Sequence, residues 1–584
     1  MLSDAAASEL GEPVSALVGP SRRAELMHDA LRWPSWRLTR RQLCDLEMLA
    51  SGGFAPLATF LGQEDHASVC ESMRLTDGSL WPMPVTLDVS TETMTAVDAS
   101  GSLALRDAEG VMVAAIHVTQ AWQPDLRAEA SAVFATTDER HPGVEYLLRR
   151  TNPWYLTGRL EVLHPFSHRD FPDLRHTPTA LRAEFATRGW TRVVAFNTRN
   201  PMHRAHLELT LRGAAQAQAH LLVHPVVGET QPGDVDRYTR VRCYQALMPS
   251  YPTGLAMLSL IPLAMRMGGP REALWHAVIR KNYGVTHVIV GRDPAGPRAI
   301  PGRAAFYRPT EARELLEQHE DEVGVKVISF SQMVYVPATG SYEHEDSVAT
   351  GTTRQQISGT ELRRRLAVGD DLPEWFTPQA VAPELRRRFP PRSERGFGIV
   401  LTGLSGAGKS TVANMLLHAV RESDARGVTL LDGEDLRSRL SSELGFSAED
   451  RERHMLRVGY VASEIAGVGG LVICALIAPY DNARRELRAM LDASGGCVLV
   501  HVATPLAVCE ARDRKGIYAK ARAGLLSDVT GVSSLYEAPT DADVVVDLSV
   551  DTPAEATGRV LSYLVSQGYL RAPWGSPTPV APAA

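Results

Sequence analysis

The sequence has no long apolar run and few cysteines. No window of about eighteen uninterrupted apolar residues occurs in the chain, so no helical membrane span and no membrane partner is expected. The N-terminus, MLSDAAA, has neither a basic start nor an apolar core and does not read as a secretory signal. The six cysteines form no C-x-x-C pair, which favours reduced thiols over disulfides or a zinc site. We therefore expect a cytoplasmic protein.

The sequence also lacks a strong excess of basic residues. It has 61 Lys and Arg against 68 Asp and Glu, and its net charge of −7 argues against non-specific binding of nucleic acid. Arginine-rich patches could still bind small anions. The apolar fraction of 44% and the charged fraction of 22% are ordinary for a globular protein. At 584 residues the chain is too long for one core, and we expect about three or four domains.

The pattern of the chain changes near residues 170 and 390. Residues 1–170 have strand-like runs at 82–89 and 110–118, which predict a β-rich domain. Residues 171–390 alternate apolar strands with helix-like segments, which predicts a parallel α/β sheet. In this region the predicted strands are 192–196, 220–227 and 287–291, and 271–280 is a predicted helix.

A proline pair followed by charges and a glycine predicts a linker at residues 391–396. A second α/β domain should then occupy residues 397–570. The remaining segment, 571–584, is rich in proline, and we expect a disordered tail there.

The most distinctive motif is GLSGAGKST, from Gly403 to Thr411. It lies between the apolar run 398–402 and a helix-like segment at 411–417, the context of a phosphate-binding loop. In such a loop backbone N–H groups and the helix N-terminus face phosphate oxygens. A chance match is the alternative, but chance rarely supplies the flanking strand and helix as well. Lys409 would reach the β- and γ-phosphates, and the Ser410 hydroxyl would hold Mg²⁺. The predicted nucleotide contacts are Gly403, Ser405, Gly406, Ala407, Gly408, Lys409, Ser410 and Thr411.

A second candidate site lies upstream, in the run FNTRNPMHRAH that ends at His206. His203 and His206 lie on one face at the start of a predicted helix, where each could offer an N–H to a phosphate. A structural or metal-binding pair is the alternative. Arg292 follows a later strand, and the carboxyl ends of parallel strands meet at one crevice. That crevice would hold two guanidinium groups, an amide and two imidazoles, with no obvious carboxylate base or nucleophile. This inventory suits attack of an anion on a nucleotide phosphate.

Residues 30–390 resemble ATP sulfurylase, a member of the H-x-G-H type nucleotidyltransferases. The likeness rests on the runs CDLE, GFAPL, LWPMP, RNPMHRAH, GD, RVR, GRD and ISGTELR, which begin at Cys44, Gly53, Leu80, Arg199, Gly233, Arg240, Gly291 and Ile357. The resemblance implies a PUA-like N-terminal domain beside a Rossmann-like nucleotidyltransferase domain. It also implies that sulfate attacks the α-phosphorus of Mg-ATP, giving adenylyl sulfate (APS) and pyrophosphate.

The same resemblance implies roles for individual residues. Arg199 would hold sulfate, with Asn197 and Thr198 in the same sulfate-contact run. Arg292 would face the α-phosphate, and Ala295 would line the sulfate pocket. The triphosphate and pyrophosphate would be stabilised by Asn200, His203 and His206.

Several positions depart from the sulfurylase pattern. Asn197 stands where the family usually has Gln, and Gln231 stands where it usually has Lys. Pro294 replaces a His, and Arg298 replaces a Gly. Losing one hydrogen bond to a charged group costs about 1.5–3 kcal/mol, or about one to two decades in rate. One interpretation is lineage drift with compensation; the other is a sulfurylase that is slow or prefers another oxyanion.

The C-terminal part, residues 397–565, resembles adenylylsulfate kinase, which phosphorylates the 3′-hydroxyl of APS to give PAPS. Besides the phosphate loop, the likeness rests on LDGEDLR, GFSAEDR, ALIAPY and DRKGIYAKAR, which begin at Leu431, Gly445, Ala475 and Asp513. The last run suits a lid that neutralises two anionic substrates and stacks on a base, although an ordinary solvated charge run is the alternative. The resemblance places Asp432 and Glu434 at the positions of the D-G-D acids. It places APS or nucleotide contacts at Arg437, Arg451, Ile477, Lys515, Tyr518 and Lys520.

The kinase-like part also departs from its family. His454 replaces an Asn, Leu456 an Arg, Ala478 a Ser and Asp481 an Arg, changes that should weaken binding of anionic APS. The family contains regulatory domains that bind PAPS without catalysis, but those have typically lost the phosphate loop. Because this chain keeps the loop, catalysis is favoured over regulation.

We therefore predict an α/β multidomain enzyme that makes APS and then PAPS. Its cofactor would be Mg²⁺ with ATP, its substrates ATP, sulfate and APS, and its assembly a homo-oligomer, as is common in both families. Two alternatives remain: a sulfurylase with a regulatory nucleotide-binding domain, and a paralogue that adenylylates another oxyanion.

Overall fold

The computed structural model describes residues 16–231, 234–291, 295–298 and 302–571. The chain divides into two compact units. The first unit comprises residues 1–357 and 373–384, and the second comprises residues 358–372 and 385–584. The chain therefore leaves the first unit, returns to it for a short segment and leaves it again.

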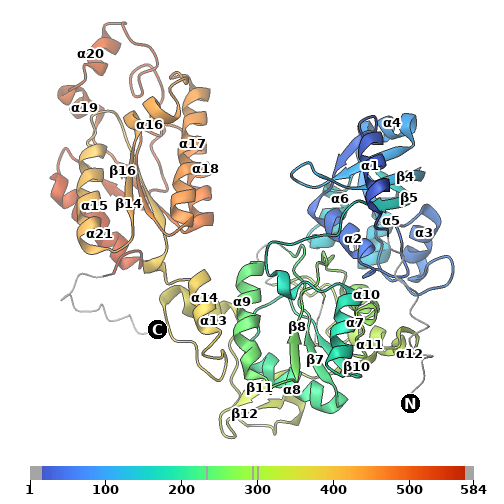
Figure 1. Ribbon diagram of the computed structural model, residues 1–584. Coiled ribbons are helices and arrows are strands. Elements are labelled where there is room, and N and C mark those ends of the chain that lie inside the picture. Colours follow the sequence, from blue (N-terminus) through green and yellow to red (C-terminus); the bar gives the residue numbers. More distant parts are fainter. Residues whose placement is uncertain (1–15, 232–233, 292–294, 299–301, 572–584) are drawn as a thin grey trace. The chain divides into compact units, whose positions relative to one another are not determined.

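The N-terminal part of the first unit is built on a five-stranded sheet of order β1-β3-β4-β5-β2 (Figure 1). β1 runs parallel to β3, and the other neighbouring strands are antiparallel. The strands are β1 Ser35–Arg37, β2 Leu87–Val89, β3 Ser102–Arg106, β4 Met112–Trp122 and β5 Trp154–Val162. The helices are α1 Pro20–Asp29, α2 Arg40–Ala50, α3 Gln63–Ser72, α4 Thr91–Ser100, α5 Leu126–Phe134 and α6 Pro142–Arg149.

Of the two strands predicted in this part, one is confirmed and one is shorter than expected. The run 110–118 forms β4, whereas the run 82–89 is extended as a strand only from Leu87. Pro82 and Pro84 explain the difference, because proline has no N–H to donate to a neighbouring strand.

The central part of the first unit is a parallel sheet of order β10-β9-β6-β7-β8. All four residues of β6 are buried, as expected for a parallel strand covered on both faces. The strands are β6 Val193–Phe196, β7 His220–Val223, β8 Ala256–Leu258, β9 His287–Val290 and β10 Lys326–Ser329, followed by the hairpin β11 Met333–Val336 and β12 Ser341–His344. The helices are α7 Pro178–Thr187, α8 Arg204–Ala217, α9 Arg237–Leu247, α10 Gly269–Asn282, α11 Glu311–Gln318 and α12 Glu320–Val323.

A single hydrophobic core runs through both parts of the first unit. Buried polar contacts reinforce it: Arg266 donates to the Asp45 carboxylate at 2.5 Å, and the Asn282 amide donates to the carbonyl of Gly53 at 3.0 Å. The N-terminal and central parts are therefore joined by shared packing, although their sequence patterns differ.

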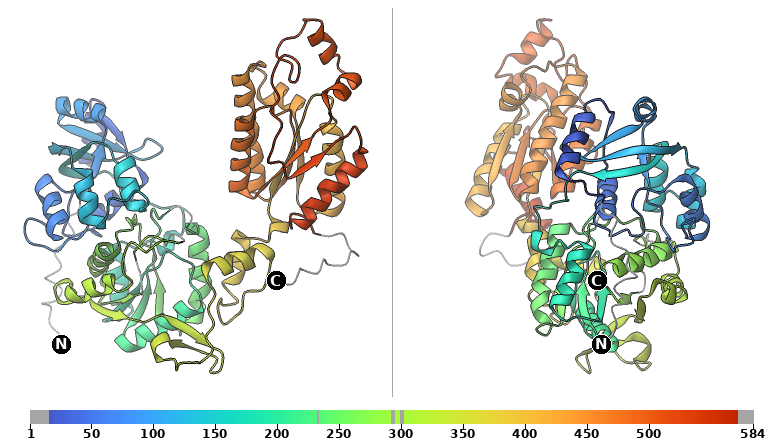
Figure 2. Two further views of the ribbon diagram at one scale, coloured as in Figure 1. Left: turned by 180° about the vertical axis from the view of Figure 1, so that it is seen from behind. Right: turned by 45° about the vertical axis from the view of Figure 1, so that its right-hand side comes forward.

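The second unit contains a parallel sheet of order β14-β15-β13-β16-β17. Helices α15 and α21 lie on one side of the sheet and α17 and α18 on the other (Figures 1 and 2). The strands are β13 Phe397–Thr402, β14 Val428–Asp432, β15 Leu471–Ala475, β16 Cys497–Val502 and β17 Val544–Val546. The helices are α13 Gly359–Val368, α14 Ala382–Arg388 (which spans the division between the units), α15 Lys409–Ser423, α16 Gly433–Leu440, α17 Ala448–Gly467, α18 Asp481–Ser494, α19 Leu506–Arg512, α20 Ile517–Arg522 and α21 Pro553–Ser566.

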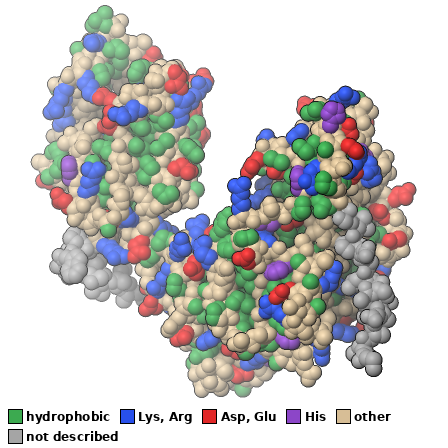
Figure 3. Space-filling model, in the orientation of Figure 1, with side chains coloured by type: hydrophobic (Ala, Val, Ile, Leu, Met, Phe, Trp, Pro, Cys, Tyr) green, Lys and Arg blue, Asp and Glu red, His purple; other side chains and the backbone are tan. Residues whose placement is uncertain are grey.

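The predicted linker contains a short 3₁₀ helix, Arg392–Glu394, and most of the predicted tail, residues 572–584, lies outside the described residues. All six cysteines are free thiols. Across the described ranges, no helix is long and apolar enough to cross a membrane. Basic and acidic side chains are interspersed on the face shown in Figure 3.

Candidate active sites

The first candidate site lies where the strand order of the central sheet reverses. From β6 the chain proceeds to β7 and β8 on one side, and later to β9 and β10 on the other. Ligands of open parallel sheets bind in the crevice at such a reversal, beyond the carboxyl ends of the strands. Residues 197–206 follow β6, and the described residues Gly291 and 295–298 follow β9, so the topology brings the motif after β6 and the described parts of the loop after β9 to one crevice.

The turn after β6 is fixed by hydrogen bonds to its own backbone. The Thr198 hydroxyl accepts the N–H of Asn200 at 3.1 Å and donates to the carbonyl of Asn200 at 3.2 Å. That carbonyl also accepts from the Tyr244 hydroxyl at 2.8 Å. The Thr198 hydroxyl is thus engaged by the turn, whereas Asn200 is exposed and its amide can meet a ligand.

Asn197, a predicted sulfate contact, is turned toward α10. Its Nδ2 lies 3.1 Å from His276 Nδ1, and its Oδ1 is buried without a hydrogen-bond partner. Burial lowers the pKa of His276, so the ring is neutral and Nδ1 can accept from the amide. His276 Nε2 lies 3.4 Å from Glu272, whose carboxylate accepts the N–H groups of Arg266 and Gly268. The amide of Asn197 is therefore held by the buried ring of His276.

The two predicted histidines lie at the start of α8, as expected. Burial lowers the pKa of His203 to about 3 and that of His206 to about 4, so both rings are neutral at pH 7. The backbone N–H of His203 donates to His206 Nδ1 at 3.1 Å, which leaves the proton of the neutral His206 ring on Nε2. No group of three or more His, Cys, Asp or Glu residues in the described segments could hold a metal ion. Each neutral ring can serve as a hydrogen-bond donor.

His203 is supported by a segment far away in the sequence. Its Nδ1 lies 3.1 Å from the hydroxyl of Thr377, and its ring stacks on Phe376 with the centroids 4.5 Å apart. The backbone N–H of Arg204 donates to the carbonyl of Phe376 at 2.9 Å. The short segment 373–384, which returns to the first unit, thus positions the start of α8.

Arg199 reaches from the turn after β6 to the loop after β9. Its guanidinium donates to the carbonyl of Gly296 at 2.9 Å, and its Nε lies 3.7 Å from Asp234 Oδ2. Ala295 is fully buried, and its carbonyl accepts the N–H of Gly269. Arg292, the residue predicted to face the α-phosphate, lies outside the described residues, as does Pro294.

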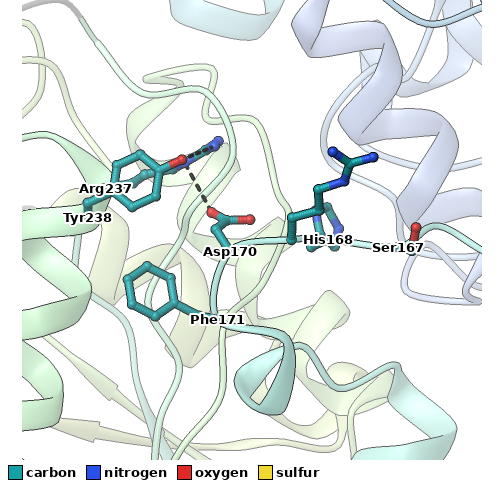
Figure 4. Close-up of a pocket in the computed structure, with 7 residues that line it drawn as sticks. Ser167, His168, Asp170, Phe171, Arg237 and Tyr238 are labelled. Atoms are coloured by element: carbon teal, nitrogen blue, oxygen red, sulfur yellow. Dashed lines mark hydrogen bonds and ion pairs between the residues drawn. The ribbon is translucent and has the colours of Figure 1, made fainter.

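A cavity of about 520 Å³ lies elsewhere in the first unit (Figure 4). Its lining consists of Ser167, His168, Arg169, Asp170, Phe171, Arg237 and Tyr238. None of the predicted site residues is among them. The Asp170 carboxylate is already engaged by Arg237 at 3.2 Å and by Arg175 at 2.9 Å.

The second candidate site is the loop between β13 and α15. Gly403 has a φ of 154°, and a Cβ there would lie 2.5 Å from the carbonyl oxygen of Val502. The side chain of Lys409 is folded under the loop, where Nζ donates to the carbonyls of Gly403 at 2.9 Å and Leu404 at 2.7 Å. Burial lowers the pKa of Lys409 to about 8. The loop and its lysine therefore have the arrangement of a phosphate-binding loop.

Two predicted residues meet at the end of β14. The Ser410 hydroxyl donates to Asp432 Oδ2 at 2.8 Å, while Asp432 Oδ1 accepts the N–H of Glu434 and caps α16. The Glu434 carboxylate forms an ion pair with Lys515. The parallel sheet thus brings Ser410 and Asp432, from separate motifs, into contact.

One residue of the predicted lid run is buried. The hydroxyl of Tyr518 donates to the carbonyl of Ser405 at 2.9 Å, which ties this run to the phosphate loop. Lys515 and Lys520 remain exposed.

Two of the predicted APS or nucleotide contacts lie beside an exposed aromatic ring. The guanidinium groups of Arg437 and Arg451 lie 4.5 and 5.4 Å from the ring centroid of Phe446, which is 55% exposed. His454, close by, has its Nδ1 3.0 Å from the Ser441 hydroxyl, and burial lowers its pKa to about 4. The carbonyl of Ile477 accepts from the Thr402 hydroxyl at 2.7 Å and so connects the end of β15 to the phosphate loop.

Sequence reasoning missed several residues that support these sites. His276 and Glu272 sit inside a predicted helix, where they look like ordinary polar positions, and Thr377 and Phe376 carry no motif. No local pattern could have found them, because each meets its partner through the fold. Phe446 had a usable signal, since an aromatic directly after Gly445 in a polar turn is seldom a core residue.

Comparison with protein families assigns each part of the chain. The PUA-like domain family matches residues 7–165, the ATP-sulfurylase family matches residues 172–388 and the adenylylsulphate kinase family matches residues 395–547. The β-rich N-terminal domain, the nucleotidyltransferase domain and the C-terminal phosphate-loop domain expected from the sequence are thus confirmed.

Relatives match along nearly the whole chain. Proteins named sulfate adenylyltransferase from Mycosarcoma maydis and Phaeosphaeria nodorum are 49% and 48% identical, over 94% of this chain and 96% of theirs. A solved structure described as a hexameric APS kinase from Thiobacillus denitrificans is 34% identical, with a TM-score of 0.78 over 96% of this chain and 99% of its own. The chain belongs to the sulfate adenylyltransferase family, as a transferase that joins an ATP-sulfurylase domain to an adenylylsulfate kinase domain.

Proposed function

We propose that this protein performs both steps of sulfate activation. It converts ATP and sulfate into APS and pyrophosphate, and it then phosphorylates the 3′-hydroxyl of APS with a second ATP to give PAPS. The observation that carries the second step is the phosphate loop, in which Lys409 is buried under the loop and Ser410 is hydrogen-bonded to Asp432.

The first step needs anion positioning rather than a base. Sulfate is already a nucleophile, so the crevice must orient it and stabilise the charge that moves onto pyrophosphate. We assign Arg199 to sulfate and Arg292 to the α-phosphate, with Ala295 lining the sulfate pocket. The neutral rings of His203 and His206, together with the exposed amide of Asn200, would donate hydrogen bonds to the phosphates.

The second step would use the loop and the residues around it. Gly403 to Thr411 would bind the phosphates of ATP, and Lys409 would exchange its two carbonyl partners for phosphate oxygens. Hydroxyl and carboxylate oxygens are the ligands that Mg²⁺ prefers, so Ser410, Asp432 and Glu434 fit the ion that accompanies ATP. That ion would offset charge on the transferred phosphate. Arg437 and Arg451 would hold APS beside Phe446. Lys515 and Lys520 would contact the nucleotides.

A turnover assay of the full-length protein tests both steps together. Mg-ATP, sulfate and pyrophosphatase are supplied, and APS and PAPS are resolved by mass. We expect PAPS with little APS. A protein that makes neither product, and does not phosphorylate supplied APS, would contradict the proposal.

A regulatory C-terminal domain is the second candidate, and the substitutions His454, Ala478 and Asp481 motivate it. The surroundings of Asp481 weaken that case, because its carboxylate pairs with Arg485 at 2.6 Å and Arg484 at 3.3 Å. Little negative charge is then left to repel APS. Accumulation of APS, with supplied APS left unphosphorylated although nucleotide still binds, would favour regulation.

The oxyanion specificity is tested in the same assay. The amide of Asn197 is hydrogen-bonded to His276. It therefore does not reach the place that the amide of a longer glutamine would occupy. Replacing sulfate by other tetrahedral oxyanions measures the effect. Pyrophosphate release that is faster with another oxyanion would make sulfate the secondary substrate. We also propose a homo-oligomer, supported by the related structure described as hexameric, and sedimentation would measure it.

A further inference from the structure

The carboxylate of Asp234 is buried between the two loops that border the crevice. Only 3% of its side chain is exposed. Its Oδ1 receives the Arg298 guanidinium at 3.1 Å and the Gln231 amide Nε2 at 3.4 Å. Its Oδ2 receives no hydrogen bond and lies 3.7 Å from Arg199 Nε. Two arginines from different loops therefore share one carboxylate.

The charges of this cluster bear on sulfate binding. If Asp234 had Arg199 as its sole cationic neighbour, the pair would be nearly neutral and would attract an anion weakly. Arg298 adds a second positive charge on the opposite carboxylate oxygen. The three groups then sum to one net positive charge, and the guanidinium of Arg199 keeps its attraction for an oxyanion.

The backbone geometry fixes this arrangement. The N–H of Arg298 donates to Gln231 Oε1 at 3.3 Å, so the Gln231 amide bridges the Arg298 backbone and Asp234. Gln231 is uncharged, and its Nε2 approaches the same Oδ1 atom as the Arg298 guanidinium. A cation at either position would therefore neutralise Asp234 from the same side.

We propose that Arg298 is a positioning residue of the sulfurylase site. By pairing with Asp234 it weakens the hold of that carboxylate on Arg199, so that the Arg199 guanidinium stays available to sulfate. The cation that offsets Asp234 thus stands at position 298 in this chain, where position 231 carries the uncharged Gln231. This inference rests on the proposed sulfate adenylation. It accounts for two departures from the family pattern with a single contact.

The test measures KM for sulfate and kcat for pyrophosphate release in the full-length protein. Arg298→Ala should raise KM for sulfate about fivefold, in line with an ion pair that is half exposed, and should change kcat little. Arg298→Lys should stay near the wild type. In the double variant Arg298→Ala with Gln231→Lys, a lysine reaches the same carboxylate and should restore KM. Arg308→Ala removes an arginine that is 70% exposed and serves as the control.

Each outcome decides between the alternatives. An unchanged KM for sulfate in Arg298→Ala overturns the inference. A raised KM that the added Gln231→Lys substitution fails to restore, while thermal unfolding stays normal, overturns it as well. Recovery by the second substitution cannot come from general damage, and it supports the exchange. A wild-type protein that releases no pyrophosphate with sulfate refutes the proposed function instead, so the two failures are distinct.

Discussion

The two candidate sites occupy the same place in two similar sheets, but they are built differently. Each follows the middle strand of a five-stranded parallel sheet, β6 in the first unit and β13 in the second. The proposed phosphate-binding loop is made of consecutive residues and would bind through their backbone N–H groups. The crevice depends on side chains from distant segments, including Arg199, His206 and Thr377. The parallel sheet thus determines where a site lies. Whether the polar groups come from consecutive residues or from distant segments determines how the site responds to a substitution.

The strongest test of this difference is Lys409→Ala. It removes the charge that the loop encloses, and we expect phosphorylation of supplied APS to fall about a thousandfold. Pyrophosphate release by the first unit should stay within about twofold, because the crevice has its own residues. Separate assays of each step measure the effect. Loss of both activities in a folded protein would show that the sites are not independent.

The matching change in the crevice is His206→Ala. It removes one neutral donor from a set of several groups, so we expect pyrophosphate release to fall about a hundredfold, less than the loss in the kinase variant. Phosphorylation of supplied APS should be unchanged. His28→Ala, an exposed histidine on α1, is the control. A loss of pyrophosphate release no larger than that of the control would show that His206 takes no part in the reaction.

The backbone dependence of the loop is tested by Gly403→Ala. A Cβ at this position meets the carbonyl of Val502, and the φ of 154° is unfavourable for alanine. We expect the second unit to lose about 2 kcal/mol in the free energy of unfolding. Calorimetry of the full-length protein measures the transition. Gly427→Ala is the control, since nothing lies within 4 Å of its Cβ; equal stability of the two variants would contradict the close contact.

The smallest predicted difference between the two units is in how far mild acid lowers their free energy of unfolding. Burial lowers the pKa of His141 to about 4, as it does for His206, and it also lowers the pKa values of His224 and His276. Each of these histidines titrates near 6.5 when unfolded, so below that pH the unfolded chain binds more protons and the free energy of unfolding falls.

The second unit has fewer such groups, mainly His454 and His501. His66 opposes the trend: although burial disfavours its charge, hydrogen bonds to Cys70 and Glu129 raise its pKa to about 10. From pH 7 to 6 we expect the first unit to lose about 1 kcal/mol more than the second. Tryptophan fluorescence follows the first unit, because all nine tryptophans except Trp574 lie there. A larger acid shift in the second unit would contradict this assignment.

The two sites also differ in how far the sequence could predict them. The phosphate loop could be read directly, because its glycines, Lys409 and Ser410 are adjacent and the flanking strand and helix are visible as patterns. The position of the crevice followed from the alternation of strands and helices. Its support did not, since Thr377 and His276 reach their partners only through tertiary packing. The hydrogen bond from the Tyr518 hydroxyl to the Ser405 carbonyl could not be predicted for the same reason, because a charge pattern does not show contacts made by the fold.

The path of the chain between the units has a consequence for how this gene can be divided. Residues 358–372 pack with the second unit, while residues 373–384 return to the first and bring Thr377 to His203. A cut after residue 357 would deprive the first unit of that support, and a cut within 391–396 would leave part of the second unit on the wrong fragment. No single break in the reading frame separates the two units cleanly. A gene arranged in this way therefore passes on the two units together, because a single cut does not yield two intact units.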